Sequence, residues 1–169
     1  QEAPTSKSVR FKWREHVTKT VSENGEALEK FCNALKDGDS KVVEQSLNNY
    51  LKKTISIWDT FVKKQMKENF YHGILLGILG FQQNWSVSSN EESGDGYSDI
   101  LIETEDQETG IIIEIKYAET GNLEAVSKDA LKQIEDRRYE EQLLEEGVEH
   151  ILKYGIAFYK KKCKVIVVK

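Results

Sequence analysis

Three charged residues interrupt two apolar segments of this 169-residue chain. Asp99 lies near the start of the segment 98–102, and Glu114 and Lys116 interrupt the isoleucine-rich run 111–116. Both segments are rich in branched aliphatic residues, which favour β-strands. A charged side chain in a buried strand is unfavourable unless another charge or a bound ion compensates it. These three residues are therefore the first candidates for chemistry.

Strand geometry suggests how these side chains meet. Residues alternate across a strand, so Glu114 and Lys116 share one face, roughly 6–7 Å apart along the backbone. If a strand over 97–103 pairs beside them, Asp99 approaches Glu114, and two close carboxylates repel unless a cation lies between them. We expect Asp99, Glu114 and the Ile115 carbonyl to bind Mg²⁺ or Mn²⁺. Lys116 would orient or deprotonate a water, which is the chemistry of phosphodiester hydrolysis.

A helix expected over 59–80 contributes a fourth acid. Glu68 and His72 continue the helical stripe of Leu75 and Leu79, which we expect to be buried. The Glu68 carboxylate would then point toward the sheet and complete the metal site, whereas the alternative is a solvated helix residue. For His72, a structural role is favoured over a ligand role.

Hydrophobic periodicity predicts the elements that position these residues. The run 110–117 is expected to be a central strand, buried on both faces. Gly73, Gly77 and Gly80 would let their helix approach the sheet closely. The expected helices cover 11–21, 26–35, 40–50, 59–80 and 122–146, and the expected strands cover 85–89, 97–103, 110–117, 151–159 and 163–168.

Composition excludes several classes of protein. Apolar residues make up 38% and charged residues 31%, which is typical of a globular protein, and the length suits one domain or one domain with a helical extension. The longest apolar run, 74–81, is too short to cross a membrane, and no secretory signal is visible. We expect a cytoplasmic protein in which Cys32 and Cys163 are unpaired.

Charge is distributed unevenly along the chain. Residues 1–80 contain 13 Lys and Arg against 10 Asp and Glu, whereas residues 81–169 contain 11 against 19. This balance argues against tight autonomous binding of nucleic acid. It argues less against a nuclease, because a bound metal ion reverses the local field. Arg137 and Arg138 lie among four acids, so ion pairs within their own helix are expected.

The segments around these residues resemble the PD-(D/E)XK nuclease superfamily. More closely, they resemble the nuclease domain at the C-terminus of bacterial AAA-ATPase-like proteins. The resemblance implies an α/β fold with a restriction-endonuclease-like αβββαβ core, in which helices flank a mixed central sheet. It covers residues 59–169, with residues 1–58 as a helical extension or connector, and rests on the segments 68–73, 89–94, 97–100, 113–116 and 130–134 with Tyr139.

The resemblance also implies a role for individual residues. Asp99 and Glu114 would be metal ligands, Lys116 the catalytic lysine, and Glu68 the acid of the first core helix. Each of these residues occupies a position that matches the superfamily pattern. The resemblance therefore implies the same metal site that strand geometry suggests.

Further polar residues and partners follow from the resemblance. Gln133 and Tyr139, on the second core helix, are expected to face DNA, and His72 is a further candidate for such a contact. Tyr139 follows Gln133 by six residues, where helicase-associated members have Gln-x-x-x-Tyr. The sequence lacks a phosphate-binding Gly-x-x-x-x-Gly-Lys-Ser/Thr loop, so the ATPase domain would lie elsewhere in the parent protein. A homodimer is a further expectation.

Three interpretations remain open from the sequence. The first is a Mg²⁺-dependent nuclease acting on DNA, with RNA as the other substrate class. The second is a nuclease fold without turnover that docks DNA or protein within a larger ATPase-containing protein. The third is an α/β domain without a site, in which Glu114 and Lys116 form a salt bridge.

Overall fold

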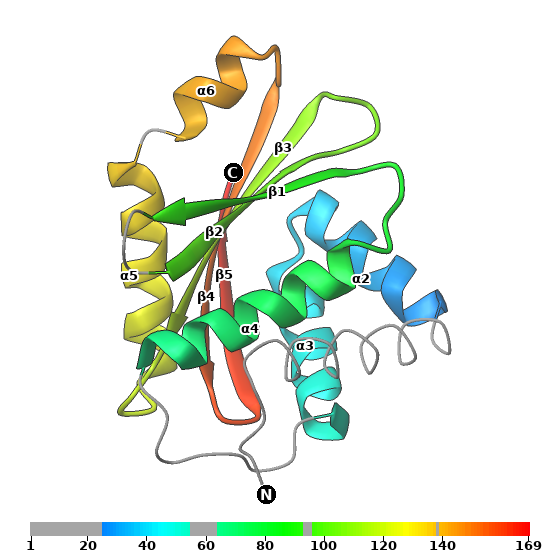
Figure 1. The fold of residues 1–169 in the computed structure, drawn as a ribbon. Helices are drawn as coiled ribbons and strands as arrows, with labels where there is room; N and C mark the ends of the chain where they lie inside the picture. The colour runs from blue at the N-terminus through cyan, green and yellow to red at the C-terminus, as the bar shows by residue number, and fades with distance from the viewer. Residues whose placement is uncertain (1–24, 55–63, 93–95, 138) are drawn as a thin grey trace, which may run out of the picture.

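A computed structural model describes residues 25–54, 64–92, 96–137 and 139–169 (Figure 1). The expected helix over 11–21 lies outside these residues. The other expected elements are present with different bounds, except that the single helix expected over 122–146 is divided in two. The elements are α2 (Gly25–Asp37), α3 (Ser40–Thr54), α4 (Lys64–Leu79), β1 (Ser86–Glu92), β2 (Gly96–Glu103), β3 (Thr109–Tyr117), α5 (Leu123–Asp136), α6 (Tyr139–Glu145), β4 (His150–Tyr159) and β5 (Lys162–Val168).

The five strands form one mixed sheet in the order β1-β2-β3-β4-β5. Neighbouring strands are antiparallel except β3 and β4, which are parallel. A parallel pair requires a crossover connection, which α5 and α6 provide. Every residue of β3 is buried except Lys116, which is partly buried. This confirms the expected central strand, covered on both faces.

Helices cover both faces of the sheet (Figure 1). On one face, α2, α3 and α4 bury a large core that includes Ile111, Ile113 and Ile115. On the other, α5 and α6 bury a smaller core around Ile112. Because side chains alternate along β3, the even-numbered residues Ile112, Glu114 and Lys116 face α5. The sheet thus separates the large core from the charged residues of β3.

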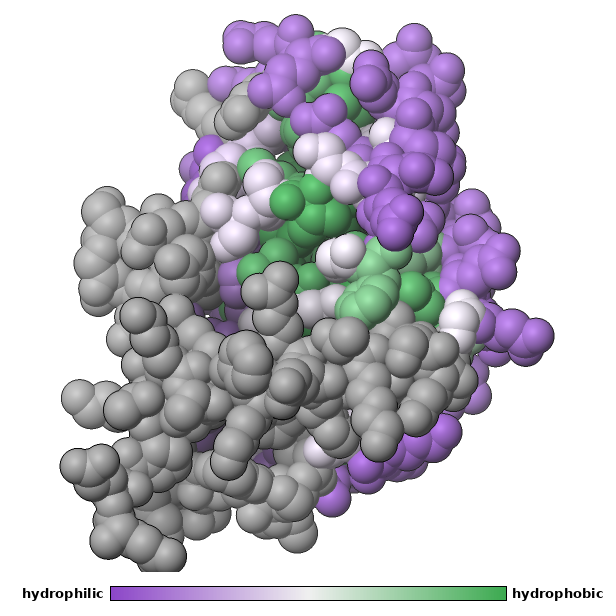
Figure 2. Space-filling model, turned by 45° about the vertical axis from the view of Figure 1, so that its right-hand side comes forward, coloured by the Kyte–Doolittle hydropathy of each residue, from purple (hydrophilic) through white to green (hydrophobic). Residues whose placement is uncertain are grey.

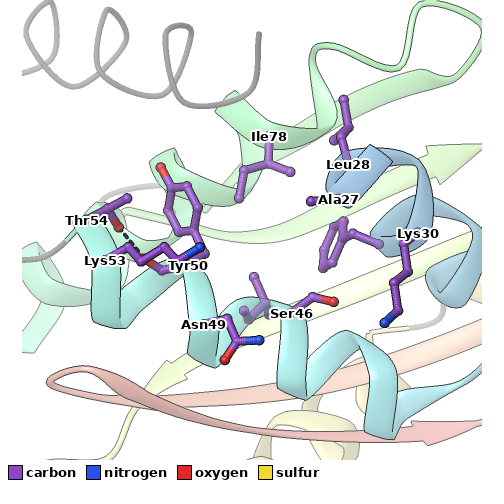
Figure 3. A pocket seen from close by; sticks show the side chains of 11 residues that line it. Ala27, Leu28, Lys30, Ser46, Asn49, Tyr50, Lys53, Thr54 and Ile78 are labelled. Atoms are coloured by element: carbon purple, nitrogen blue, oxygen red, sulfur yellow. Dashed lines mark hydrogen bonds between the residues drawn. The ribbon is translucent and has the colours of Figure 1, made fainter. Parts of the chain in front are cut away.

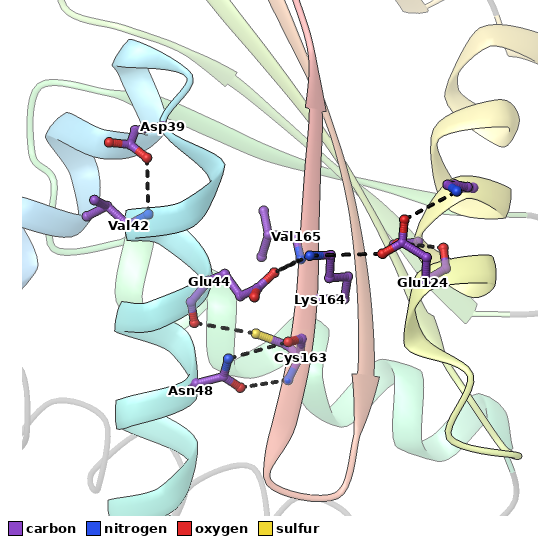
Figure 4. Close-up of polar contacts among 10 residues, drawn as sticks. Asp39, Val42, Glu44, Asn48, Glu124, Cys163, Lys164 and Val165 are labelled. Carbon is purple, nitrogen blue, oxygen red and sulfur yellow. Dashed lines mark hydrogen bonds and ion pairs between the residues drawn. The ribbon is translucent and has the colours of Figure 1, made fainter.

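Side chains of α3 cover the outer edge of β5 (Figure 4). Asn48 Oδ1 accepts a hydrogen bond from the Cys163 amide at 2.8 Å, and Glu44 Oε2 accepts one from the Val165 amide at 2.8 Å. These contacts satisfy backbone groups that an open sheet edge would leave exposed. The two helices of the expected extension that the structure describes therefore share both the core and the edge of the sheet.

The long helix expected over 122–146 is in fact two helices. α5 ends at Asp136, and the Arg137 amide closes its last turn by donating to the Ile134 carbonyl at 3.3 Å. The break before α6 lets Leu143 pack into the smaller core with Ile134, although both lie in one amphipathic run. Tertiary packing, which the helical periodicity does not encode, produces this break.

A close approach between helix and sheet occurs at Gly155, and not at Gly73, where one was expected. Gly73 is exposed, and a Cβ added there would meet nothing within 4 Å. The expectation for Gly73 was therefore wrong. At Gly155 on β4, a Cβ would meet the Ser127 carbonyl oxygen of α5 at 2.3 Å. The close contact thus lies on the α5 face, beside Glu114, with which Gly155 is in register.

The two cysteines and the lengths of the helices bear on the environment expected for the protein. Cys32 and Cys163 are both buried and unpaired, as expected. Burial raises the pKa of the Cys32 thiol to about 11 and also raises that of Cys163. None of the helices in the described ranges combines the length and apolarity needed to span a bilayer.

Candidate active site

Two buried carboxylates lie opposite each other on neighbouring strands. Asp99 of β2 is in register with Glu114 of β3, and each residue is only 1% exposed. Directly opposed residues of an antiparallel pair have Cβ atoms about 4.5–5.5 Å apart. The pairing expected from the sequence is thus confirmed, and it brings two acids together on the α5 face.

The two carboxylates differ in their partners. Asp99 Oδ2 lies 2.8 Å from Arg137 Nη1, which gives this acid a charged hydrogen bond. Oε1 and Oε2 of Glu114 are buried and have no hydrogen-bond partner in the part of the chain that the structure describes. A buried carboxylate without a partner is strongly unfavourable. Glu114 therefore has the surroundings that a bound cation would stabilise.

A divalent cation fits the donors at this site. The carboxylates of Asp99 and Glu114, with the Ile115 carbonyl, would be hard oxygen ligands of the kind that Mg²⁺ and Mn²⁺ prefer. The described ranges contain no group of three His, Cys, Asp or Glu side chains that could hold a metal ion. A cation here would thus depend on the backbone carbonyl and on water for its remaining ligands, which is common for Mg²⁺.

Lys116 lies on the same face as Glu114, two residues farther along β3. It is partly buried and forms no ion pair with any other residue of the described segments. The salt bridge between Glu114 and Lys116, proposed in the third interpretation, is therefore absent. The ammonium group remains available to a ligand at the end of the strand.

Glu68 lies on α4, which covers the opposite face of the sheet. Its Oε1 accepts a hydrogen bond from the Tyr117 amide at 3.0 Å. This contact places the carboxylate at the end of β3, three positions beyond Glu114 and directly after Lys116. In this structure Glu68 holds the strand end, and its role as a metal ligand remains a prediction.

His72 connects α4 to both strands beneath it. The ring is 3% exposed, and its Nε2 lies 3.0 Å from Ser89 Oγ on β1. Burial lowers the pKa of the imidazole, while a hydrogen bond with the Asp99 backbone opposes this shift. The residue thus helps to hold the backbone that carries Asp99. Its contact with DNA remains a prediction, and the buried ring presents no open surface for one.

The fold and this geometry agree with a comparison to known protein families. A family model of the PD-(D/E)XK nuclease superfamily matches residues 66–168, which is more than half of the chain. The chain belongs to this superfamily. Its five-stranded mixed sheet, flanked by helices, is consistent with the restriction-endonuclease-like fold expected from the sequence. No curated protein matches the chain significantly.

The matched region of this PD-(D/E)XK chain includes both expected polar residues of the second core helix. Gln133 is partly buried on α5, whereas Tyr139 begins α6 and packs against the smaller core. They do not share one helix, because α5 ends at Asp136. The expectation of a shared helix was wrong, and their contact with DNA remains a prediction.

Sequence reasoning missed the partner of Asp99. Arg137 was expected to pair within its own helix, and the structure shows it paired with Asp99, which precedes it by 38 positions. One signal was available in the sequence, since a buried aspartate needs a cation and a helix end can position an arginine. Pairing two such distant residues from the sequence alone would have required the fold.

The described residues also form a pocket, away from the carboxylates of this PD-(D/E)XK site. It has a volume of about 260 Å³ and lies between α2, α3 and Ile78 of α4 (Figure 3). Figure 2 shows apolar surface on this side of the molecule. The lining is mainly apolar, with Lys30 and Lys53 but no acid. It contains no carboxylate to bind a divalent cation, so the carboxylate pair is the better candidate for hydrolysis.

Proposed function

We propose that this chain is a metal-dependent nuclease domain that hydrolyses phosphodiester bonds of DNA. Asp99, Glu114 and the Ile115 carbonyl are its metal ligands, and Lys116 is its catalytic lysine. The proposal rests on one observation above the others, which is the buried and unpartnered Glu114 carboxylate opposite Asp99. Superfamily membership supports the same type of reaction.

The side chains divide the work of hydrolysis. A bound Mg²⁺ or Mn²⁺ would lower the pKa of a water and offset phosphate charge. Lys116 orients the attacking water and stabilises negative charge on the phosphate. Water adds to phosphorus as one phosphorus–oxygen bond breaks, so the products are a phosphate monoester and a hydroxyl, without a covalent enzyme intermediate. Glu68, the fourth catalytic residue that we propose, holds the end of the strand that carries Lys116.

The proposal also covers the parent protein of this domain, its partners and its assembly. We propose a bacterial, cytoplasmic AAA-ATPase-like parent protein whose ATPase domain lies elsewhere in its chain. DNA is the proposed partner, RNA is the alternative substrate, and a homodimer is the proposed assembly. Gln133 and Tyr139 are proposed to contact the nucleic acid from the α5–α6 side.

A second candidate function is a nuclease fold that docks DNA or protein without turnover. The acidic balance of residues 81–169, with 19 acids against 11 basic residues, favours this alternative. The unpartnered Glu114 favours the enzyme, because a docking module has no need for a buried charge. Cleavage assays separate the two functions directly.

The test is incubation of the purified chain with linear, circular and single-stranded DNA and with RNA, in Mg²⁺ or Mn²⁺. We expect cleavage that EDTA stops and that Lys116→Ala slows by at least about 100-fold. Lys132→Ala is the matched control, because this lysine is exposed on α5 and should be dispensable. Undiminished cleavage by Lys116→Ala would contradict the role of that lysine. No cleavage of any substrate would favour the docking module.

A further inference from the structure

The ion pair between Arg137 and Asp99 suggests a role for Arg137 beyond the fold. We propose that Arg137 is a positioning residue that holds Asp99 in the metal-free protein and releases this carboxylate when the metal ion binds. This inference rests on the proposed function, because it needs Asp99 to be a metal ligand. It goes further by naming the group that competes with the metal.

The first support is the geometry of the pair. Arg137 Nη1 lies 2.8 Å from Asp99 Oδ2, a distance typical of a charged hydrogen bond. The Asp99 side chain is 1% exposed, whereas the Arg137 side chain is 23% exposed. The carboxylate is therefore enclosed within the fold, while the Arg137 side chain keeps partial access to solvent.

The second support is the asymmetry between the two acids. Glu114 has neither a hydrogen-bond partner nor a counter-ion in the described segments, although it lies directly opposite Asp99. A divalent cation bound by both carboxylates would bring two positive charges close to the guanidinium. Like charges repel strongly in a site with little water. The metal and the guanidinium therefore compete for Asp99.

The third support is the position of Arg137 on its helix. It is the C-cap of α5, at the break before α6. The carbonyl groups at a helix C-terminus carry partial negative charge and favour a nearby cation. Arg137 and Asp99 also make further contacts. Exchange requires the loss of this ion pair, and the released guanidinium remains beside favourable carbonyl dipoles.

Competition of this kind predicts the direction of a change in metal affinity. When the binding-competent state of a protein is populated for only a fraction of the time, the apparent affinity for its ligand is reduced by that fraction. Removing the guanidinium should therefore tighten metal binding. A site open about one tenth of the time would gain roughly tenfold in affinity. A purely structural Arg137 predicts no gain.

The experiment is a calorimetric Mn²⁺ titration of the purified chain and four variants. We expect Arg137→Gln to bind Mn²⁺ roughly tenfold more tightly than the wild type, and Glu114→Gln to lose this binding. Lys132→Gln removes one positive charge from an exposed position of α5 and controls for net charge. It should bind Mn²⁺ like the wild type. Arg137→Lys, which keeps the charge but loses the planar fork, should lie in between.

Thermal unfolding gives a second measurement that does not depend on activity. In EDTA, Arg137→Gln should melt below the wild type, because Asp99 loses its charged partner. Saturating Mn²⁺ should reduce or remove this difference, since the metal then stabilises Asp99 in both proteins. A difference of equal size with and without Mn²⁺ would indicate a structural contact and would overturn the inference.

The possible results separate the inference from the proposed function. If the wild type binds Mn²⁺ through Glu114 but Arg137→Gln binds equally or more weakly, the inference is wrong and the proposed metal site stands. If neither protein binds Mn²⁺, or if Glu114→Gln binds it unchanged, the proposed metal site is wrong and the inference fails with it. Tighter binding by the Arg137 variants, with unchanged binding by Lys132→Gln and lost binding by Glu114→Gln, supports both.

Discussion

At the scale of residues, Asp99 and Glu114 occupy paired positions on neighbouring strands but differ in whether a partner compensates their buried charge. Both acids are 1% exposed and face α5. Asp99 has a guanidinium partner, whereas the oxygens of Glu114 have none in the described ranges. A functional site commonly keeps such an unfavourable group because the ligand, and not the fold, compensates it. Neutralising the two acids should therefore have opposite effects.

We predict that Glu114→Gln raises the free energy of unfolding of the metal-free protein by about 1 kcal/mol, because it removes an unpaired buried charge. Asp99→Asn should lower it by about 1–3 kcal/mol, because it weakens a charged hydrogen bond to Arg137. Urea unfolding in EDTA measures both changes. Glu145→Gln, at an exposed position of α6, should stay within about 0.5 kcal/mol of the wild type. Changes of the same sign at Asp99 and Glu114 would contradict this account.

At the scale of elements, the contact of α5 with β4 determines where Arg137 can reach. Gly155 lets the Ser127 carbonyl and the Leu131 backbone lie against the strand, at positions where a Cβ would come within 2.3 and 3.0 Å. Gly155 is also in register with Glu114. The helix that ends at Arg137 is thus held tightly against the sheet beside the carboxylates.

We predict that Gly155→Ala lowers the free energy of unfolding by about 1–3 kcal/mol, because the methyl group would push α5 away from β4. Gly73→Ala is the matched control, since this exposed helical glycine has space around its Cα. It should raise stability by about 0.5–1 kcal/mol. Chemical denaturation of both variants measures the difference. Equal stability of the two variants would show that α5 can move without cost.

At the scale of the whole molecule, α2 and α3 belong to the same packed body as the sheet. Leu35, Leu47 and Leu51 are buried in one core with Ile113 of β3. The Tyr154 hydroxyl of β4 donates to the Leu35 carbonyl at 2.7 Å.

Ion pairs also connect α3 to the sheet. Lys164 Nζ of β5 lies 3.5 Å from a carboxylate oxygen of Glu44 on α3 and 3.9 Å from one of Glu124 on α5 (Figure 4). These contacts predict cooperative unfolding, while the boundary at residue 58 remains a prediction.

We predict that Leu47→Ala lowers the free energy of unfolding by about 2–5 kcal/mol, because it leaves a cavity between α3 and the sheet. Leu144→Ala, at a side chain that is 52% exposed, should change it by less than about 0.5 kcal/mol. Circular dichroism and tryptophan fluorescence should report one coincident transition for each protein. Separate transitions would indicate that the helical segment folds independently of the sheet.

The sequence by itself determined the features that depend on local periodicity. Alternation along β3 placed Glu114 and Lys116 on one face, and isoleucines on both faces indicated a buried central strand. The order of helices and strands, together with the motif around Asp99, indicated the fold class. These features were predictable because each follows from residues that are close together in the chain.

Only the tertiary structure decided which distant groups meet. The Arg137–Asp99 ion pair, the Glu68–Tyr117 hydrogen bond and the contact of Gly155 with Ser127 join residues 28 to 49 positions apart. The division of one amphipathic run into α5 and α6 likewise depends on packing against the sheet. Such contacts arise from how the elements dock, and docking is governed by summed packing and electrostatics across the molecule that local periodicity does not contain.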